Sequence, residues 1–137
     1  MNVLSSFQQV DTFIFVVDGV LTDGTVLVLE SGEMAPRMII KDGYALQLAV
    51  KKGYRMFIVS GSSPSAVEKR LNYLGISEIY FQVKDKKAFV QSLAEKNAFD
   101  LGNDLFMGDD MPDLPVFDIV GLSCCPADAV SDLKSAA

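Results

Sequence analysis

Five short runs of apolar residues recur along the chain, each with the length and composition of a β-strand. The first run, Thr12–Val17, is dominated by β-branched and aromatic residues, which is typical of a strand buried on both faces of a parallel sheet. It ends abruptly at Asp18 and Gly19. The other four runs are Tyr54–Val59, Ile79–Phe81, Asp104–Met107 and Val120–Leu122.

The segments between these runs have apolar residues at the spacing of an α-helix. Leu46, Ala49 and Val50 share one face of a helix that we expect to have Asp42 as its N-cap and to run through Lys52. Further helices are expected from Ser63 (N-cap) and Pro64 (N1) to Gly75, from Asp85 to Lys96, at Pro112, and from Pro126 to Ala137. This alternation predicts an α/β fold, a doubly wound parallel sheet with right-handed crossovers. We expect a single domain over residues 1–137.

Two further extended segments, Thr25–Leu29 and Met34–Ile40, lie between the first strand and the first helix. The four residues that join them, 30–33, include Gly32 and have the composition of a turn. We therefore expect a β-hairpin insertion over about residues 25–40, projecting from the loop after the first strand. Asn2–Gln9 is interpreted as a short lead-in segment.

Composition narrows the chemistry that this fold can carry. The chain contains no histidine, which excludes His-based acid–base catalysis and His-ligated zinc. A net charge of −6 argues against nucleic-acid or anionic-membrane partners. Cys124 and Cys125 are adjacent, and neighbouring cysteines rarely form a disulfide with each other. No disulfide framework is therefore expected, which fits a reducing, cytoplasmic location. No window is apolar enough for a membrane span, and the N-terminus does not resemble a secretory signal.

Polar residues follow several of the predicted strands at their carboxyl ends. Because parallel strands bring these ends to one edge of the sheet, acids, hydroxyls and a lysine from distant segments are expected to converge there. Clustered carboxylates suit Mg²⁺, and Ser60, the Gly61 amide and a lysine suit a phosphate. The residues concerned are Asp18, Asp23, Ser60, Gly61, Lys86, Asp109, Asp110 and Asp113.

Each of these residues also has a simple structural interpretation. Acids at strand–helix turns usually act as caps, Ser60-Gly61 alone is a loop, and a lysine such as Lys86 is usually exposed. Asp113, just after Pro112, is well placed to complement a helix dipole. Their combination, in this chain order and at one sheet edge, favours a phosphate site over these separate explanations.

The motifs resemble the haloacid dehalogenase (HAD) superfamily, whose fold is Rossmann-like. More narrowly, the chain is similar over its whole length to the small capless 3-deoxy-D-manno-octulosonate 8-phosphate phosphatases. The segments that carry the resemblance are residues 18–24 (DGVLTDG), 41–44 (KDGY), Ser60-Gly61, Lys86 and residues 108–115 (GDDMPDLP).

This resemblance implies Mg²⁺-dependent hydrolysis of a sugar-acid phosphate through an aspartyl-phosphate. Asp18 would be the general acid/base and offer its carbonyl to Mg²⁺, Asp109 would ligate the metal, and Asp110 and Asp113 would support that loop. Phosphoryl oxygens would be held by Ser60 and Gly61, with Lys86 neutralising charge, and Lys41 and Asp42 would border the sugar. The family also implies a homotetramer in which one subunit's hairpin closes a neighbour's site, and a tail beyond the last helix.

Two residues depart from the family pattern. Val16 occupies the position of the nucleophilic and metal-ligating aspartate, and valine can neither attack phosphorus nor bind Mg²⁺. We therefore predict low or absent turnover and weakened Mg²⁺ binding. Ser62 stands where an arginine is common, which is expected to weaken anion binding or alter subunit contacts. The alternative hypothesis is a non-catalytic HAD-like oligomerisation or regulatory module, and nine-carbon sugar-acid phosphates remain open as substrates.

Overall fold

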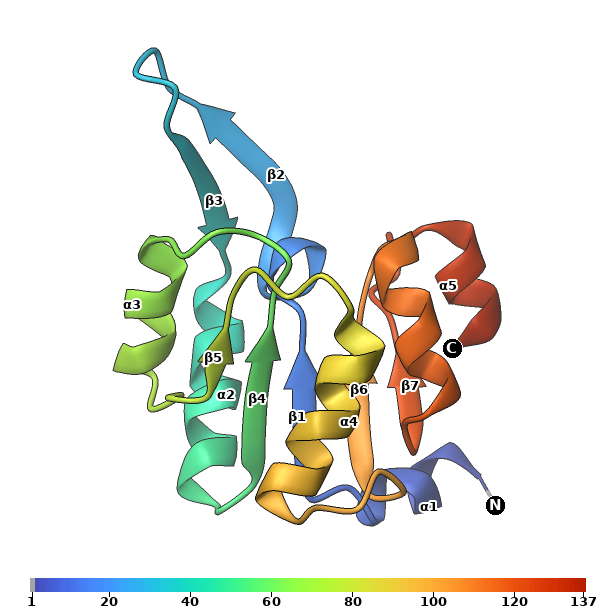
Figure 1. Ribbon diagram of the computed structural model, residues 1–137. Helices are drawn as coiled ribbons and strands as arrows, with labels where there is room; N and C mark the ends of the chain where they lie inside the picture. Colours follow the sequence, from blue (N-terminus) through green and yellow to red (C-terminus); the bar gives the residue numbers. More distant parts are fainter. Residues whose placement is uncertain (1) are drawn as a thin grey trace.

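A five-stranded parallel sheet forms the centre of the computed structural model, which describes residues 2–137 (Figure 1). The strand order is β5-β4-β1-β6-β7, with every neighbouring pair parallel. This confirms the predicted α/β class with a parallel sheet. The strands are β1 (Thr12–Phe15), β4 (Arg55–Val59), β5 (Ile79–Tyr80), β6 (Asp104–Met107) and β7 (Leu122–Cys124).

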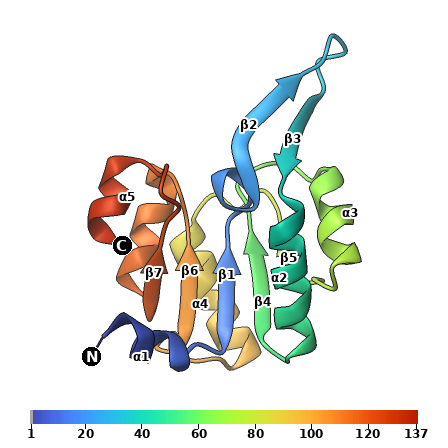
Figure 2. The ribbon, with the colours of Figure 1, turned by 180° about the vertical axis from the view of Figure 1, so that it is seen from behind.

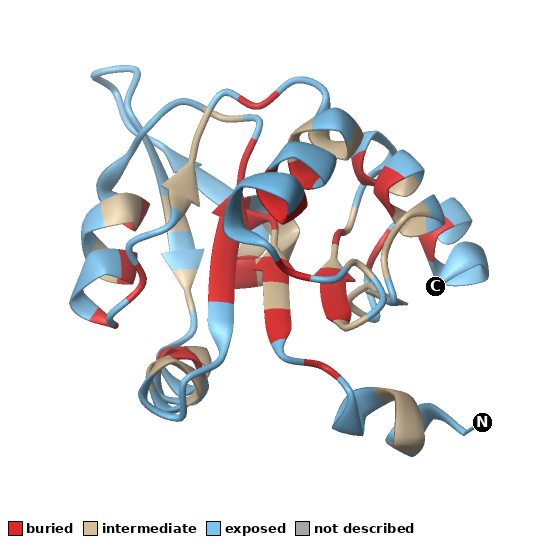
Figure 3. Cartoon of the chain, turned by 60° about the horizontal axis from the view of Figure 1, so that its bottom comes forward, coloured by how far each residue is buried: buried red, intermediate tan, exposed pale blue. Residues whose placement is uncertain are grey.

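Helices cover the sheet on both faces (Figures 1 and 2). On one face Ile14 and Phe106 pack against Val90 of α4 and Val116 of the 3₁₀ helix η2. On the other, α2 and α3 pack mainly over β4, and buried residues concentrate along the central strands and the inner helix faces (Figure 3). The helices are α1 (Val3–Gln8), α2 (Ile40–Lys51), α3 (Ala66–Tyr73), α4 (Lys86–Asn97), η2 (Met111–Asp118) and α5 (Ser131–Ala136). No helix within residues 2–137 is long and apolar enough to cross a membrane.

The predicted hairpin is present and forms a separate two-stranded sheet. Its strands, β2 (Thr22–Val28) and β3 (Met34–Met38), are antiparallel and extend away from the main body (Figure 1). β1 leads into β2 through a tight turn, η1 (Val17–Leu21), whose backbone is not helical at Asp18 and Gly19. The hairpin exposes large apolar side chains to water: Val26, Leu27, Val28, Leu29 and Met34.

Several predicted boundaries are wrong by a few residues. Asp42 is not the N-cap of α2, because the chain enters the helix directly from β3 and Ile39 takes the cap position without a side-chain hydrogen bond. Asp42 instead lies in the first turn, where it complements the helix dipole. Ser65, not Ser63, caps α3 by accepting from the Val67 amide.

The ends of the chain differ most from the prediction. The N-terminal lead-in contains the short helix α1, which Asn2 caps through its side chain. The fifth parallel strand is Leu122–Cys124 rather than Val120–Leu122, and the last helix begins at Ser131 rather than Pro126. Asp85 does cap α4 as predicted, accepting from the Ala88 amide at 3.0 Å.

Asp104 is a fully buried acid at the start of β6. Its Oδ1 accepts a hydrogen bond from the Gly121 amide at 2.8 Å, whereas Oδ2 has no partner among the described residues. Burial, with the charges of Asp100 and Asp11 nearby, raises the pKa of this carboxyl to about 6. The ionised side chain is therefore destabilising in the folded protein.

We expect Asp104→Asn to stabilise the protein at neutral pH by about 1–2 kcal/mol. The pKa is near 4 in an unfolded chain and about 6 in the folded protein. The stabilising contribution of the protonated carboxyl is therefore complete below about pH 4 and is lost as the pH rises through about 6. The advantage of the variant should grow over that interval and then level off. Urea denaturation across it measures the difference, with exposed Asp132→Asn as control; a pH-independent difference would contradict the prediction.

Candidate functional site

A polar pocket of about 180 Å³ lies at the carboxyl ends of β1, β4 and β6. It brings together predicted site residues that are far apart in the sequence. Val16, Asp18, Ser60, Gly61, Lys86, Asp109 and Asp110 all line it, as do Val17, Ser62, Pro112 and Asp113. The convergence follows from the topology, since three adjacent parallel strands deliver their following loops to one edge.

Val16 is part of both the core and the pocket wall. Its side chain is only 3% exposed and packs in the same cluster as Ile14 and Phe106. Its amide donates to the Met107 carbonyl at 3.2 Å, just beyond the paired residues of β1. The valine therefore fits the fold well, while the pocket receives no polar atom from its side chain.

Two serine hydroxyls lie at the end of β4. The backbone of Ser60 is fixed on both sides, its amide donating to Tyr80 and its carbonyl accepting from Val83. The Ser60 and Ser62 hydroxyls are 2.7 Å apart, and the Ser62 amide donates to Ser60 Oγ at 3.1 Å. With its oxygen engaged in this way, the buried Ser60 is held in place at the pocket wall. From the sequence, Ser62 was considered only as a residue that replaces the family's arginine, and its pairing with the Ser60 hydroxyl was not predicted.

Asp113 connects the lysine to the acidic loop. Lys86, at the start of α4, donates to Asp113 Oδ1 at 2.5 Å, and the two side chains are 12% and 2% exposed. Asp113 Oδ2 accepts from the amides of Asp109 and Asp110, at 3.0 and 3.2 Å. Asp113 therefore orients both Lys86 and the turn after β6. The sequence suggested support for the loop but not this ion pair, which joins residues 27 positions apart.

Asp109 lies tightly against the turn that follows β1. A Cβ on Gly19, which has a φ of +84°, would come within 1.8 Å of Asp109 Oδ2, so only glycine leaves room for this carboxylate. Burial, together with the charges of Asp113, Asp110 and Asp128, raises the pKa of Asp109 to about 6. Crowding of this kind destabilises the ionised form unless a cation is present.

The carboxylates fit a divalent cation only in part. Within residues 2–137, no group of three or more Asp, Glu, Cys and His side chains is arranged to hold a metal ion. Mg²⁺ often binds through one or two carboxylates and keeps several waters, so Asp109, Asp110 and the backbone carbonyl of Asp18 are a suitable but sparse ligand set. The valine at position 16 supplies no further ligand.

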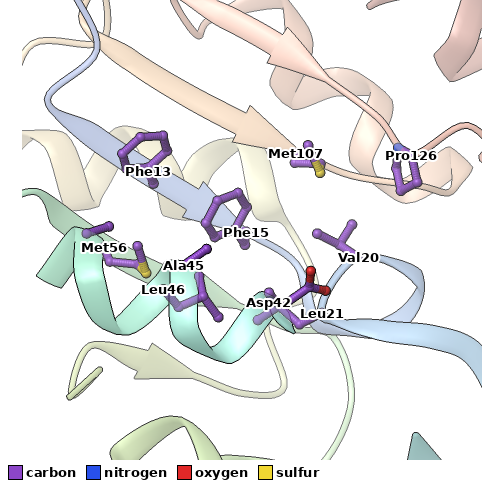
Figure 4. Close-up of a pocket in the computed structure, with 11 residues that line it drawn as sticks. Phe13, Phe15, Val20, Leu21, Asp42, Ala45, Leu46, Met56, Met107 and Pro126 are labelled. Carbon is purple, nitrogen blue, oxygen red and sulfur yellow. The ribbon is translucent and has the colours of Figure 1, made fainter. Parts of the chain in front are cut away.

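Lys41 and Asp42 do not line the polar pocket. Asp42 lies at the edge of a separate, largely apolar groove of about 420 Å³ that extends over Phe13, Phe15 and Met107 (Figure 4). Lys41 is exposed on the first turn of α2. Both residues follow the base of the hairpin, so their predicted contact with a sugar stays a prediction.

Comparison with known proteins identifies relatives along most of the chain. No family model matches it. The 3-deoxy-D-manno-octulosonate 8-phosphate phosphatase KdsC of Escherichia coli K12 is 34% identical over 128 residues, covering 93% of this chain and 68% of that protein. The chain belongs to the KdsC family.

Solved structures of KdsC phosphatases have the same fold. The Yersinia pestis protein matches with a TM-score of 0.93 and 30% identity, over 98% of this chain and 73% of that one. The Moraxella catarrhalis enzyme was crystallised with a magnesium ion, a phosphate ion and KDO. It matches with a TM-score of 0.91 and 26% identity, over 99% of this chain and 80% of that one. These relatives are phosphatases, as the motifs had indicated. A Legionella pneumophila protein assigned to the HAD superfamily of hydrolases matches with a TM-score of 0.92 and 29% identity, over 98% of this chain and 74% of that one.

Proposed function

We propose that this chain carries the site of a Mg²⁺-dependent sugar-acid phosphate phosphatase, acting on 3-deoxy-D-manno-octulosonate 8-phosphate or a similar ester, and that Val16 leaves it strongly impaired. The observation that carries the proposal is the pocket itself. It brings acids, hydroxyls and a lysine together, which are groups that suit a phosphate ester and a cation, and it has a buried valine in its wall. Reversion of Val16 to aspartate, assayed as phosphate release, is the experiment that tests it.

Each side chain has a defined role in this proposal. Ser60, the Gly61 amide and Lys86 hold the phosphoryl oxygens, and Asp113 keeps Lys86 oriented through their ion pair. Asp18 is the general acid that protonates the leaving sugar oxygen. Asp109, Asp110 and the Asp18 carbonyl would hold the Mg²⁺, which when bound neutralises phosphate charge. Lys41 and Asp42, beside the hairpin, border the sugar.

A second candidate function is a non-catalytic oligomerisation or regulatory module. It is favoured by Val16, and by the exposed apolar hairpin, because an isolated two-stranded hairpin is marginally stable in water. Both functions are compatible with a homotetramer in which the hairpin packs on a neighbouring subunit and closes its site. A cytoplasmic location is compatible with the two free cysteines.

Leu27→Lys is expected to break the proposed tetramer into smaller species. Leu27 is 64% exposed in the single subunit, and its burial in an interface would make a charge there costly. Size-exclusion chromatography with light scattering measures the mass. Val3→Lys is the matched control, because Val3 is 63% exposed on α1, at the opposite end of the molecule from the hairpin (Figure 1). An unchanged mass for Leu27→Lys, or the same loss in both variants, would contradict a hairpin interface.

A further inference from the structure

The ligand set for a cation in the polar pocket is incomplete. Asp109 and Asp110 reach the pocket from the turn after β6, and Asp18 reaches it from the turn after β1. These side chains form no group of three that could hold a metal ion within residues 2–137, and Val16 adds none. A hard cation in such a site commonly completes its shell with waters and with an oxygen of a bound phosphate.

The same pocket is also a poor site for an anion alone. Its one lysine is already paired with Asp113 at 2.5 Å. Asp18, Asp109 and Asp110 form no salt bridge of their own within residues 2–137. A phosphate dianion entering alone would find the donors of Ser60, Ser62 and Gly61 but would be repelled by these carboxylates. A divalent cation between them would remove much of that repulsion.

From these two deficits, and resting on the proposed function, we infer that this pocket binds a divalent cation and a phosphate monoester only as a pair. The phosphate supplies a coordinating oxygen to the cation, and the cation neutralises the charge that would repel the phosphate. Linkage requires the two effects to be equal, so the cation raises phosphate affinity by the same factor as phosphate raises cation affinity.

Val16 is the residue that makes the pairing obligatory. An aspartate there would give the cation a further carboxylate ligand and would therefore let it bind alone. In this chain the bound ester also meets no nucleophile at position 16, so it is held without being cleaved. The chain would then act as a receptor whose occupancy requires a divalent cation and a phosphate ester together.

Isothermal titration calorimetry on the full chain tests the inference, with Mg²⁺ and inorganic phosphate as probes. Each probe is titrated into protein alone and into protein saturated with the other probe. We expect affinity for each to rise at least tenfold in the presence of the other, which corresponds to about 1.4 kcal/mol. Equal affinities in the two conditions would overturn it, as would tight binding of either probe alone.

Three variants locate the effect. Val16→Asp is expected to bind Mg²⁺ alone at least tenfold more tightly and to show a smaller coupling factor. Ser62→Ala should weaken phosphate binding in the presence of Mg²⁺. Lys87→Met, which removes a cation one residue from Lys86 but outside the pocket, should change nothing. Equal Mg²⁺ affinity in the original chain and Val16→Asp, or equal loss of phosphate binding in Ser62→Ala and Lys87→Met, would contradict the assignment.

This inference and the proposed function can fail separately. If Val16→Asp has no phosphatase activity while the original chain still shows the coupling, the proposed function alone is contradicted. If Val16→Asp hydrolyses the ester while the original chain binds Mg²⁺ and phosphate independently, the inferred coupling alone is contradicted.

Discussion

Val16→Asp is expected to raise Mg²⁺-dependent phosphate release from 3-deoxy-D-manno-octulosonate 8-phosphate by about 10⁴-fold or more. The magnitude follows from what the loss of a catalytic nucleophile costs other enzymes, on the order of 10⁴ to 10⁶ in rate. Position 16 lines the same pocket as Asp18, Ser60 and Lys86, so a carboxylate there would share the pocket with the proposed general acid and the proposed phosphoryl-binding groups. The assay measures inorganic phosphate, with Mg²⁺ or EDTA, over a panel that includes nine-carbon sugar-acid phosphates.

Val16→Asn is the matched control for this reversion. Asparagine has nearly the same shape as aspartate and disturbs the core cluster of Ile14 and Phe106 in the same way, but it brings no carboxylate. We expect it to stay inactive. Equal rates for the two folded variants would exclude the disabled phosphatase and favour the regulatory module. Rapid Mg²⁺-dependent hydrolysis by the original chain would contradict our interpretation of Val16.

The reversion should also lower stability in the absence of metal. An aspartate at position 16 would replace a side chain that is 3% exposed and would add a charge to a pocket already lined by Asp18 and Asp109. Burial of such a charge without a counter-ion is unfavourable. Thermal unfolding should therefore show a lower Tm for Val16→Asp in EDTA, with recovery in Mg²⁺. A Tm unaffected by Mg²⁺ would argue against a metal ligand at this position.

Local pattern was sufficient to predict the parallel sheet and the meeting of most of the predicted polar residues at one edge of it, but Asp23, Lys41 and Asp42 do not line the polar pocket there. Uninterrupted apolar runs such as Thr12–Val17 can be buried only in the middle of a layered fold, and parallel strands necessarily bring Asp18, Ser60 and Asp109 to one edge. Boundaries were harder, because the start of α2 depends on how β3 delivers the chain to it. Asp is a residue type favoured at helix N-caps, yet α2 begins at Ile40, two residues before Asp42.

Interactions between distant residues could not be predicted from sequence. The Lys86–Asp113 pair and the orphaned oxygen of Asp104 are consequences of packing between separate elements, and no local pattern encodes them. The Ser60–Ser62 hydroxyl pair is local but depends on the turn that follows β4. The hairpin itself was predicted from the sequence. The exposure of its apolar side chains was not, because it depends on how the rest of the chain packs.

Asp113→Ala is expected to destabilise the protein by about 3–5 kcal/mol, the cost of removing one partner of a buried ion pair. Lys86 would lose its counter-ion while only 12% exposed, and the amides of Asp109 and Asp110 would lose their acceptor. The turn after β6 and the lysine would both lose their orientation. Urea denaturation measures the change, and a cost below about 1 kcal/mol would contradict the assigned role.

The control for this variant is Asp118→Ala, which removes the other acid paired with a lysine of α4. Asp118 is 77% exposed and lies 4.0 Å from Lys87, so its loss should change stability by less than about 0.5 kcal/mol. A double variant, Lys86→Met with Asp113→Ala, separates the charge pair from the amide contacts. If the unpaired lysine is the main cost, the double variant should be more stable than Asp113→Ala alone, because no uncompensated charge is left buried. If it is no more stable, the loss of the acceptor for the Asp109 and Asp110 amides accounts for the destabilisation, and Asp113 acts mainly on the loop.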